Sequence, residues 1–351
     1  MKNRCLAPIG DVLRRRSTFV SLVVVAASCA SEVPETVNAP VVSTIMSTTT
    51  AAPLESSTTT KPSARGSTTK APVVTTTTPV VADSTTTVPA RTTVAPTTTK
   101  AVPTTTESMT TRLVRVQYGD APQQVGDLRV PPGVGPFGVV VFVHGGFWRS
   151  GFDETLMTAL AVDATNRGVA TWNFNYRSVG DPGGGYPGTL EDVALAMDHL
   201  AVLDEDLLLD DVTVIGHSAG GHLALWASSR HFLRSGDPGA DPVVRPHTAV
   251  AQAAVVDLRF AAAVNMGGSA VEALLGGEPD EVPEHYRVAQ PVFEGQRIIV
   301  VHGRYDQVVP ISQSGLIDGA IGIFDDTGTH FDVLDPRHEL WLRTVEEIGL
   351  D

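Results

Sequence analysis

Continuous apolar runs alternate with amphipathic stretches along the C-terminal two-thirds of the chain. The runs "FGVVVFV" (137–143), "VTVIGH" (212–217) and "RIIVVHG" (297–303) are rich in β-branched residues. Runs of this kind are typical of strands that are buried on both faces of a parallel sheet. Helical patterns lie between and after them, in 154–166, 186–203, 220–230 and 336–350. The alternation predicts an α/β fold with a mostly parallel central sheet and helices on both faces.

Two segments depart from this alternation. The stretches "RLVRVQYG" (112–119) and "QVGDLRV" (124–130) predict an antiparallel pair of strands at one edge of the sheet. Residues 259–291 show no sustained period. We expect that segment to shape a pocket rather than to add a strand.

The N-terminal third lacks any apolar period. Residues 30–111 consist mainly of Thr, Ser, Pro, Ala and Val, as in "TTTTPVVADSTTTVPARTTVAPTTTK". Such a segment buries too little apolar surface to offset the entropy of ordering it. It is therefore interpreted as a disordered Thr/Pro-rich stalk, and residues 112–351 as one folded domain with its own core.

Residues 1–29 have the pattern of an export signal. Lys2, Arg4 and "RRR" (14–16) precede an uncharged run of 12 residues, "STFVSLVVVAAS". This run is too short to span a bilayer and fits a secretory signal peptide. Small residues then lead to Cys29, as in a lipoprotein signal, and the chain's one other cysteine, Cys5, would leave with the signal. We expect a lipid anchor at Cys29, with ordinary cleavage nearby as the alternative; either way the protein would be exported.

Charge narrows the range of partners. The chain has a formal net charge of −14; residues 1–30 carry +4 and residues 31–111 balance, which leaves −18 on residues 112–351. So acidic a domain argues against nucleic acid or an anionic lipid surface as its partner. The N-terminal lipid would be its one connection to a membrane.

The pentapeptide Gly216-His217-Ser218-Ala219-Gly220 stands where a predicted strand meets a predicted helix. A serine on such a sharp turn has an exposed hydroxyl, and small residues on either side let strand and helix approach closely. The same pattern occurs by chance as a packing turn, but its position between a strand and a helix favours a nucleophile. Ser218 is therefore the candidate nucleophile.

A serine nucleophile needs a base, and the base needs an orienting acid. Asp306 follows "RIIVVHG" at a strand end, where catalytic groups gather in open α/β sheets. Asp257, in "VVDL", is a competitor for the acid. His330 lies in the loop "DDTGTHFDVLDP" and is preferred as the base over His338, which begins the final helix.

The stretch "VHGGFW" follows the first strong strand. Its glycines let the backbone turn N–H groups toward a substrate oxygen, so an oxyanion hole is expected from the backbone of Gly145, Gly146, Phe147 and Ala219. His144 is interpreted as a structural residue that shapes this loop. The sequence has no H-E-x-x-H, C-x-x-C or G-x-x-x-x-G-K-[ST] motif, so neither a metal nor another cofactor is expected.

Five ordered motifs together resemble the α/β-hydrolase superfamily: "HGGFW", "NYRS", "GHSAGGHLA", "HGRYDQVVP" and "THFDVLDP". More narrowly, residues 113–347 resemble the kynurenine-formamidase-like esterases and the BD-FAE (feruloyl-esterase-like) group. The resemblance implies the α/β-hydrolase fold, a triad of Ser218, Asp306 and His330, and a small-molecule ester as substrate. An amidase or formamidase with the same triad is the first alternative. A non-catalytic binding module and a prolyl-oligopeptidase-type peptidase are less favoured.

Overall fold

The computed structural model describes residues 110–351. The expected signal peptide (1–29), Cys29 and nearly all of the expected stalk (30–111) lie outside the described residues. Within residues 110–351, no helix is both long and apolar enough to cross a membrane.

The described chain is built on one eight-stranded sheet in the order β1-β2-β4-β3-β5-β6-β7-β8. β1 pairs with β2, and β2 with β4, in antiparallel fashion, whereas all the other neighbouring strands are parallel. The predicted α/β class and the antiparallel edge pair are both confirmed. The strands are β1 (Arg112–Gln117), β2 (Val125–Val130), β3 (Phe137–Val143), β4 (Ala170–Phe174), β5 (Leu207–His217), β6 (Thr248–Gln252), β7 (Arg297–Gly303) and β8 (Ile321–Asp325).

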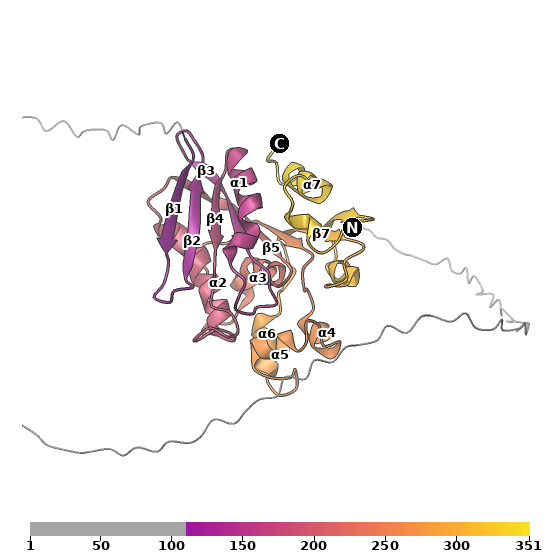
Figure 1. Cartoon of the computed structure of the whole chain (residues 1–351). Helices are drawn as coiled ribbons and strands as arrows, with labels where there is room; N and C mark the ends of the chain where they lie inside the picture. The colour runs from indigo at the N-terminus through magenta and orange to yellow at the C-terminus, as the bar shows by residue number, and fades with distance from the viewer. Residues whose placement is uncertain (1–109) are drawn as a thin grey trace, which may run out of the picture. The chain divides into compact units, whose positions relative to one another are not determined.

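Seven α-helices accompany these strands in the described chain. They are α1 (Thr158–Asn166), α2 (Gly188–His199), α3 (Ala219–Ser229), α4 (Leu258–Ala263), α5 (Ala270–Leu275), α6 (Pro283–Ala289) and α7 (Glu339–Glu347). Short 3-10 turns are η1 (Glu154–Met157), η2 (Leu200–Val202), η3 (Arg230–Phe232), η4 (Ile311–Leu316) and η5 (Asp332–Leu334). Figure 1 shows α4, α5 and α6 gathered together beyond one end of the sheet.

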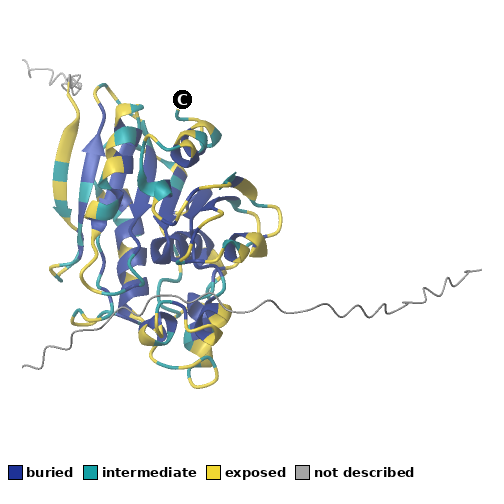
Figure 2. Cartoon of the chain, turned by 45° about the vertical axis from the view of Figure 1, so that its right-hand side comes forward, coloured by how far each residue is buried: buried dark blue, intermediate teal, exposed yellow. Residues whose placement is uncertain are grey.

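Two apolar cores lie on opposite faces of the sheet. On one face, alternate strand residues such as Phe142 and Ile215 pack with α1 and α7; the rings of Phe142 and Trp341 are 6.3 Å apart. On the other face, residues such as Val141 and Val214 pack with α2 and α3. The strands β4 and β6 are buried throughout, while β1 is largely exposed at its edge (Figure 2). The alternation of apolar side chains between two covered faces explains the continuous apolar runs of the sequence.

The segment between β6 and β7 is more regular than the sequence suggests. It forms α4, α5 and α6, each only six or seven residues long. Asn265 and Ser269, in the turn between α4 and α5, have positive φ angles of 53° and 52°. Helices this short, joined by strained turns, leave no periodic signal in a sequence.

The loop that follows β4 is fixed by one buried carboxylate. Asp192 of α2 has a side chain that is 1% exposed, and it accepts hydrogen bonds from the backbone N–H of Arg177 (2.9 Å), from the Arg177 guanidinium (2.6 and 2.8 Å) and from Gln124 Nε2 (2.6 Å). These contacts join α2, the loop after β4 and the start of β2.

Asp192→Ala should lower the free energy of unfolding by about 3–5 kcal/mol, because it leaves a partly buried guanidinium and two other donors without their acceptor. Urea unfolding of the full chain measures the loss. Asp326→Ala removes a carboxylate from an ion pair at the surface, with Arg304, and should leave the unfolding midpoint unchanged. Equal midpoints for the Asp192 variant and the wild type would show that the buried contacts contribute nothing.

Candidate active site

Ser218 lies on the turn between β5 and α3 in a strained backbone conformation, with φ 56° and ψ −119°. The turn is sharp because strand and helix nearly touch. A Cβ at Gly216 would lie 2.0 Å from the carbonyl oxygen of Gly220, and one at Gly220 would lie 2.2 Å from that of Val143. Only glycine fits at both positions. Ser218 is 2% exposed, and its Oγ makes no hydrogen bond within residues 110–351.

Asp306 and His330 meet although 24 positions separate them in the chain. His330 Nδ1 lies 2.7 Å from Asp306 Oδ2, and both side chains are buried, with exposures of 4% and 0%. Asp306 follows the end of β7, and His330 lies in the loop after β8. The two strands are parallel neighbours, so their carboxyl ends bring the two loops together.

Electrostatics keep Asp306 ionised. Burial alone would raise the pKa of this carboxyl, but hydrogen bonds from His302, His330 and the Val309 N–H outweigh burial and hold the pKa well below its usual range. An ionised carboxylate only accepts hydrogen bonds, so Nδ1 of His330 carries the proton in their contact. The other ring nitrogen of a neutral His330, Nε2, is then an unprotonated base.

The competing residues have other roles. Asp257 caps α4: its Oδ1 accepts a hydrogen bond of 2.9 Å from the backbone N–H of Phe260. His338 caps α7 in the same way, with Nδ1 accepting from the Leu340 N–H at 3.2 Å. The structure therefore brings Asp306, and not Asp257, to His330.

His217 connects the His330 loop to the serine turn. Its Nε2–H donates to the carbonyl oxygen of His330 at 3.0 Å, and the two rings are 4.6 Å apart. Burial, and then the neighbouring His330, lower the pKa of His217 to about 3, so the ring is neutral near neutral pH. Because His217 directly precedes Ser218, this hydrogen bond holds the backbone of His330 beside the serine turn.

The loop after β3 passes against the same turn. A Cβ at Gly145 would lie 2.8 Å from the carbonyl oxygen of His217 and 3.1 Å from Cβ of Ser218. Phe147 and Trp148 have φ angles of 53° and 54°, which are unusual for residues with side chains. The backbone N–H groups of Gly146 and Phe147 have no acceptor within residues 110–351. Ala219 is the first residue of α3, so its N–H likewise has no acceptor within the helix.

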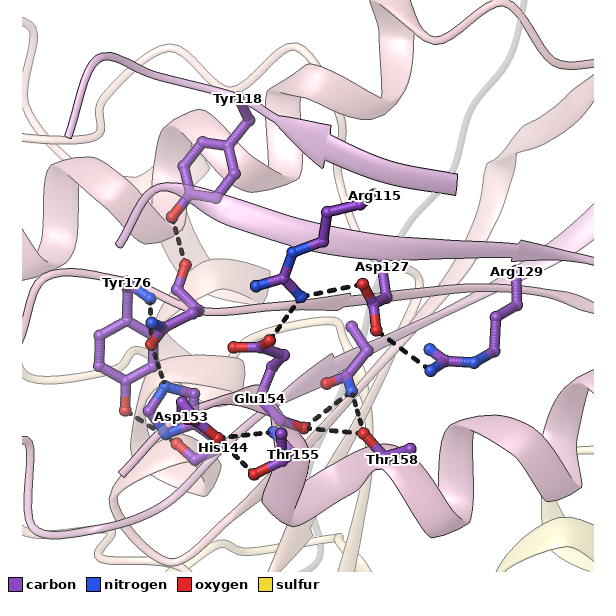
Figure 3. A network of polar contacts seen from close by, with 12 residues as sticks. Arg115, Tyr118, Asp127, Arg129, His144, Asp153, Glu154, Thr155, Thr158 and Tyr176 are labelled. Carbon is purple, nitrogen blue, oxygen red and sulfur yellow. Dashed lines mark hydrogen bonds and ion pairs between the residues drawn. The ribbon is translucent and has the colours of Figure 1, made fainter. Parts of the chain in front are cut away.

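Two aromatic residues set the direction of this loop's peptide groups. Tyr176 Oη donates to the carbonyl oxygen of His144 at 2.8 Å, and its ring stacks on His144 at 4.2 Å (Figure 3). His144 Nδ1 lies 2.8 Å from the carbonyl oxygen of Gly145. In a trans peptide the N–H points away from the carbonyl oxygen. The N–H groups of Gly145 and Gly146 are therefore turned away from His144 and Tyr176. His144 thus has the loop-shaping position that the sequence suggested.

A charged network supports the segment that follows this loop. Arg115 of β1 donates to Asp127 of β2 (2.9 Å) and to Glu154 of η1 (2.5 Å), as Figure 3 shows. The carbonyl oxygen of Glu154 in turn accepts from Asn173 of β4 at 2.8 Å. The antiparallel edge of the sheet thereby fixes η1, which directly follows the loop.

The segment between α4 and α5 closes on the loop from the other side. A Cβ at Gly267, whose φ is +65°, would lie 2.4 Å from the ring of Phe147. Arg149 Nη2 donates to the carbonyl oxygen of Gly268 at 2.5 Å. The turn at Gly267 and Gly268 is therefore in direct contact with both ends of 147–149.

His302, the sixth residue of β7, was not identified from the sequence. It is fully buried, and its Nε2 lies 2.9 Å from Asp306 Oδ2. The signal was present, since a histidine four residues before the candidate acid interrupts an otherwise apolar strand. Nothing in the sequence states which face of β7 it occupies relative to Asp306.

The described residues include no group of three or more His, Cys, Asp or Glu side chains that could hold a metal ion.

The depressed pKa of Asp306 makes the stability of the fold pH-dependent. The unfolded chain takes up a proton on this carboxyl near its usual pKa of about 3.9, before the folded chain does. The stabilisation is therefore present above about pH 4 and is lost as the pH falls toward the folded pKa. Asp306→Asn lacks this contribution, so its free energy of unfolding should fall less than that of the wild type between pH 5 and pH 3.

Urea unfolding at the two pH values measures this difference. Asp257→Asn makes the same change in net charge and serves as the matched control. Parallel losses for wild type and Asp306→Asn would contradict the pKa direction.

Comparison with known proteins identifies the family of this chain. The BD-FAE family model matches residues 127–321, which is more than half of the chain. No curated protein matches the chain.

Solved structures share the fold. A bifunctional GH43-CE protein of Bacteroides eggerthii is 22% identical with a TM-score of 0.55; the match covers 67% of this chain but only 37% of that one. Esterase B of Lactobacillus rhamnosis, inhibited by a C4-C4 SN3 tributyrin phosphonate, is 19% identical (TM-score 0.58; 70% and 85% covered). The acetyl ester-xyloside bifunctional hydrolase of Caldicellulosiruptor lactoaceticus is 18% identical (TM-score 0.54; 69% and 98% covered). The expected fold and group are thus confirmed: the chain is an α/β-hydrolase and belongs to the BD-FAE family.

Proposed function

We propose that this protein is a serine hydrolase that cleaves carboxylic esters of small molecules through an acyl-enzyme intermediate. The observation that carries the proposal is the buried contact between Asp306 and His330 (2.7 Å), on a loop that His217 holds beside the strained turn of Ser218. Membership of the BD-FAE family supports it, as do the structural neighbours named as esterases.

In this mechanism each residue has one role. Ser218 Oγ attacks the acyl carbon while His330 Nε2 takes its proton, and Asp306 holds the histidine in the required tautomer. The carbonyl oxygen becomes an oxyanion that backbone N–H groups from Gly145, Gly146, Phe147 and Ala219 stabilise. Collapse of this intermediate transfers the proton from His330 to the departing alcohol and leaves the acyl group on Ser218.

Water completes the cycle. His330 takes a proton from the water as it attacks the acyl carbon, a second oxyanion forms in the same place, and its collapse returns the proton to Ser218 Oγ and releases the acid. An amide would follow the same steps with an amine as the leaving group. The amidase alternative therefore differs in substrate rather than in machinery.

Ser218→Ala should lower the hydrolysis of an aryl ester by 10⁴-fold or more, because no other group of the triad can form the acyl-enzyme. Initial rates of the purified full chain on an aryl ester and on a formanilide measure the activity and also separate esterase from formamidase. Asp257→Asn serves as a control for a carboxylate outside the triad and should act at nearly the wild-type rate. An alanine variant that hydrolyses the ester as fast as the wild type would exclude Ser218.

We also propose that the protein is exported and anchored by lipid at Cys29. The basic N-terminus, the short apolar run and the small residues before Cys29 motivate this proposal. The two or more acyl chains of a lipoprotein give stable membrane attachment where one chain gives only marginal binding.

In cell fractionation, the wild-type chain should enter the detergent phase with the membranes, whereas Cys29→Ser should be released or remain unprocessed. A wild-type protein found in the medium with a free N-terminus near Ser31 would show simple secretion instead.

A further inference from the structure

We propose that His302 is a positioning residue for the reaction. It donates a hydrogen bond to Oδ2 of Asp306, the oxygen that also contacts His330, and thereby keeps the carboxylate oriented toward His330. The inference rests on the proposed function, because it assigns His302 a role through the triad of Ser218, Asp306 and His330.

The hydrogen bonds of Asp306 carry the proposal. Oδ1 accepts from the backbone N–H groups of Val308 (2.7 Å) and Val309 (2.9 Å). Oδ2 accepts from His302 Nε2 (2.9 Å) and His330 Nδ1 (2.7 Å). A carboxylate offers about four lone-pair sites. All four are thus occupied, and His302 fills the one that shares an oxygen with the proposed base.

The proton of His302 can be located from its partners. Nε2 faces Asp306 Oδ2 and also the carbonyl oxygen of Val309 at 3.0 Å. Both are acceptors, so Nε2 carries the hydrogen. Nδ1 lies 2.7 Å from Ser314 Oγ in η4, whose hydroxyl can donate to it. With Ser314 as the donor, Nδ1 accepts, and the ring has its proton on Nε2, as the contact with Asp306 requires.

Burial makes this contact strong and excludes a direct role. The side chains of His302 and Asp306 are both 0% exposed. His302 therefore does not touch substrate, and its effect on the reaction passes through Asp306. Without it, Oδ2 has an unfilled site in a water-poor interior, and three hydrogen bonds instead of four fix the orientation of the carboxylate.

The N–H of His302 also partly neutralises the negative charge of Oδ2. His302 from β7 contacts Asp306, His217 from β5 contacts His330, and the carboxylate of Asp332 lies on the His330 loop, where it accepts from Thr329. With His302 absent, more of the carboxylate's charge acts on His330 and favours its protonated form. A protonated His330 cannot act as a base, so the acid limb of the pH–rate profile should move to higher pH.

The test compares variants of the full chain by kcat, KM and the pH dependence of kcat/KM on an aryl ester. His302→Leu removes both ring nitrogens, and kcat should fall roughly 10- to 100-fold, as expected for one lost hydrogen bond to a charged group. KM should stay within about threefold, and the acid limb should move upward. His302→Gln can place an amide N–H near the position of Nε2 and should restore most of kcat and of the profile.

Two more variants keep the test informative if His302→Leu does not fold. Ser314→Ala removes only the partner of Nδ1, and its kcat should lie between the values of wild type and His302→Leu. Val300→Ala deletes apolar packing on the same face of β7; it should lower the melting temperature but leave kcat within about twofold. If His302→Leu is unstable, two other results together still support the proposal. Ser314→Ala should then show a reduced kcat and a moved acid limb, and His302→Gln should show a kcat and a pH profile close to those of the wild type.

A wild-type kcat and pH profile in folded His302→Leu would overturn the positioning role. A folded His302→Gln as impaired as His302→Leu, or a Ser314→Ala profile identical to that of the wild type when His302→Leu does not fold, would do the same. Ser218→Ala, measured alongside, separates a failure of the proposed function from a failure of the role of His302. Activity in Ser218→Ala would refute the proposed function itself, whereas an inactive Ser218→Ala beside a normal His302→Leu would refute only the role of His302.

Discussion

The contact between the end of β3, the end of β5 and the start of α3 is the constraint on which the rest of the site depends. The absent side chain of Gly220 leaves room for the carbonyl oxygens of Val143 and His144, which a Cβ would approach to 2.2 and 2.3 Å. The serine turn and the proposed oxyanion loop are thus parts of one packed unit. Any displacement of α3 is transmitted directly to the backbone of the neighbouring loop.

Much of this architecture could be predicted from the sequence because strong local patterns encode it. Buried strands give continuous apolar runs, and the glycines around Ser218 mark the close approach of strand and helix. The choice between Asp306 and Asp257 was harder, since both follow an apolar strand. The structure separates them through contacts that no local pattern contains: Asp257 caps a helix, whereas Asp306 reaches a histidine 24 positions away.

Other features depend on long-range geometry and could not be predicted. His302 stands in a strand of apolar residues, and its partners Asp306 and Ser314 are defined by how the chain returns after β7. The helices α4, α5 and α6 are too short for a periodic signal. The contact of Thr189 in α2 with the carbonyl oxygen of Arg177, 12 positions earlier, likewise has no local signal.

The contact between Gly267 and Phe147 has a consequence for how such a protein can diversify. The segment that holds α4 to α6 adds no strand to the sheet, although its buried residues belong to the core on one face. Yet one of its turns lies against the ring of a residue whose backbone belongs to the proposed oxyanion loop. A substitution at Gly267 that reshapes the pocket would therefore also displace Phe147 and change turnover. Pocket shape and turnover are in that sense coupled through one position, Gly267, that has no side chain.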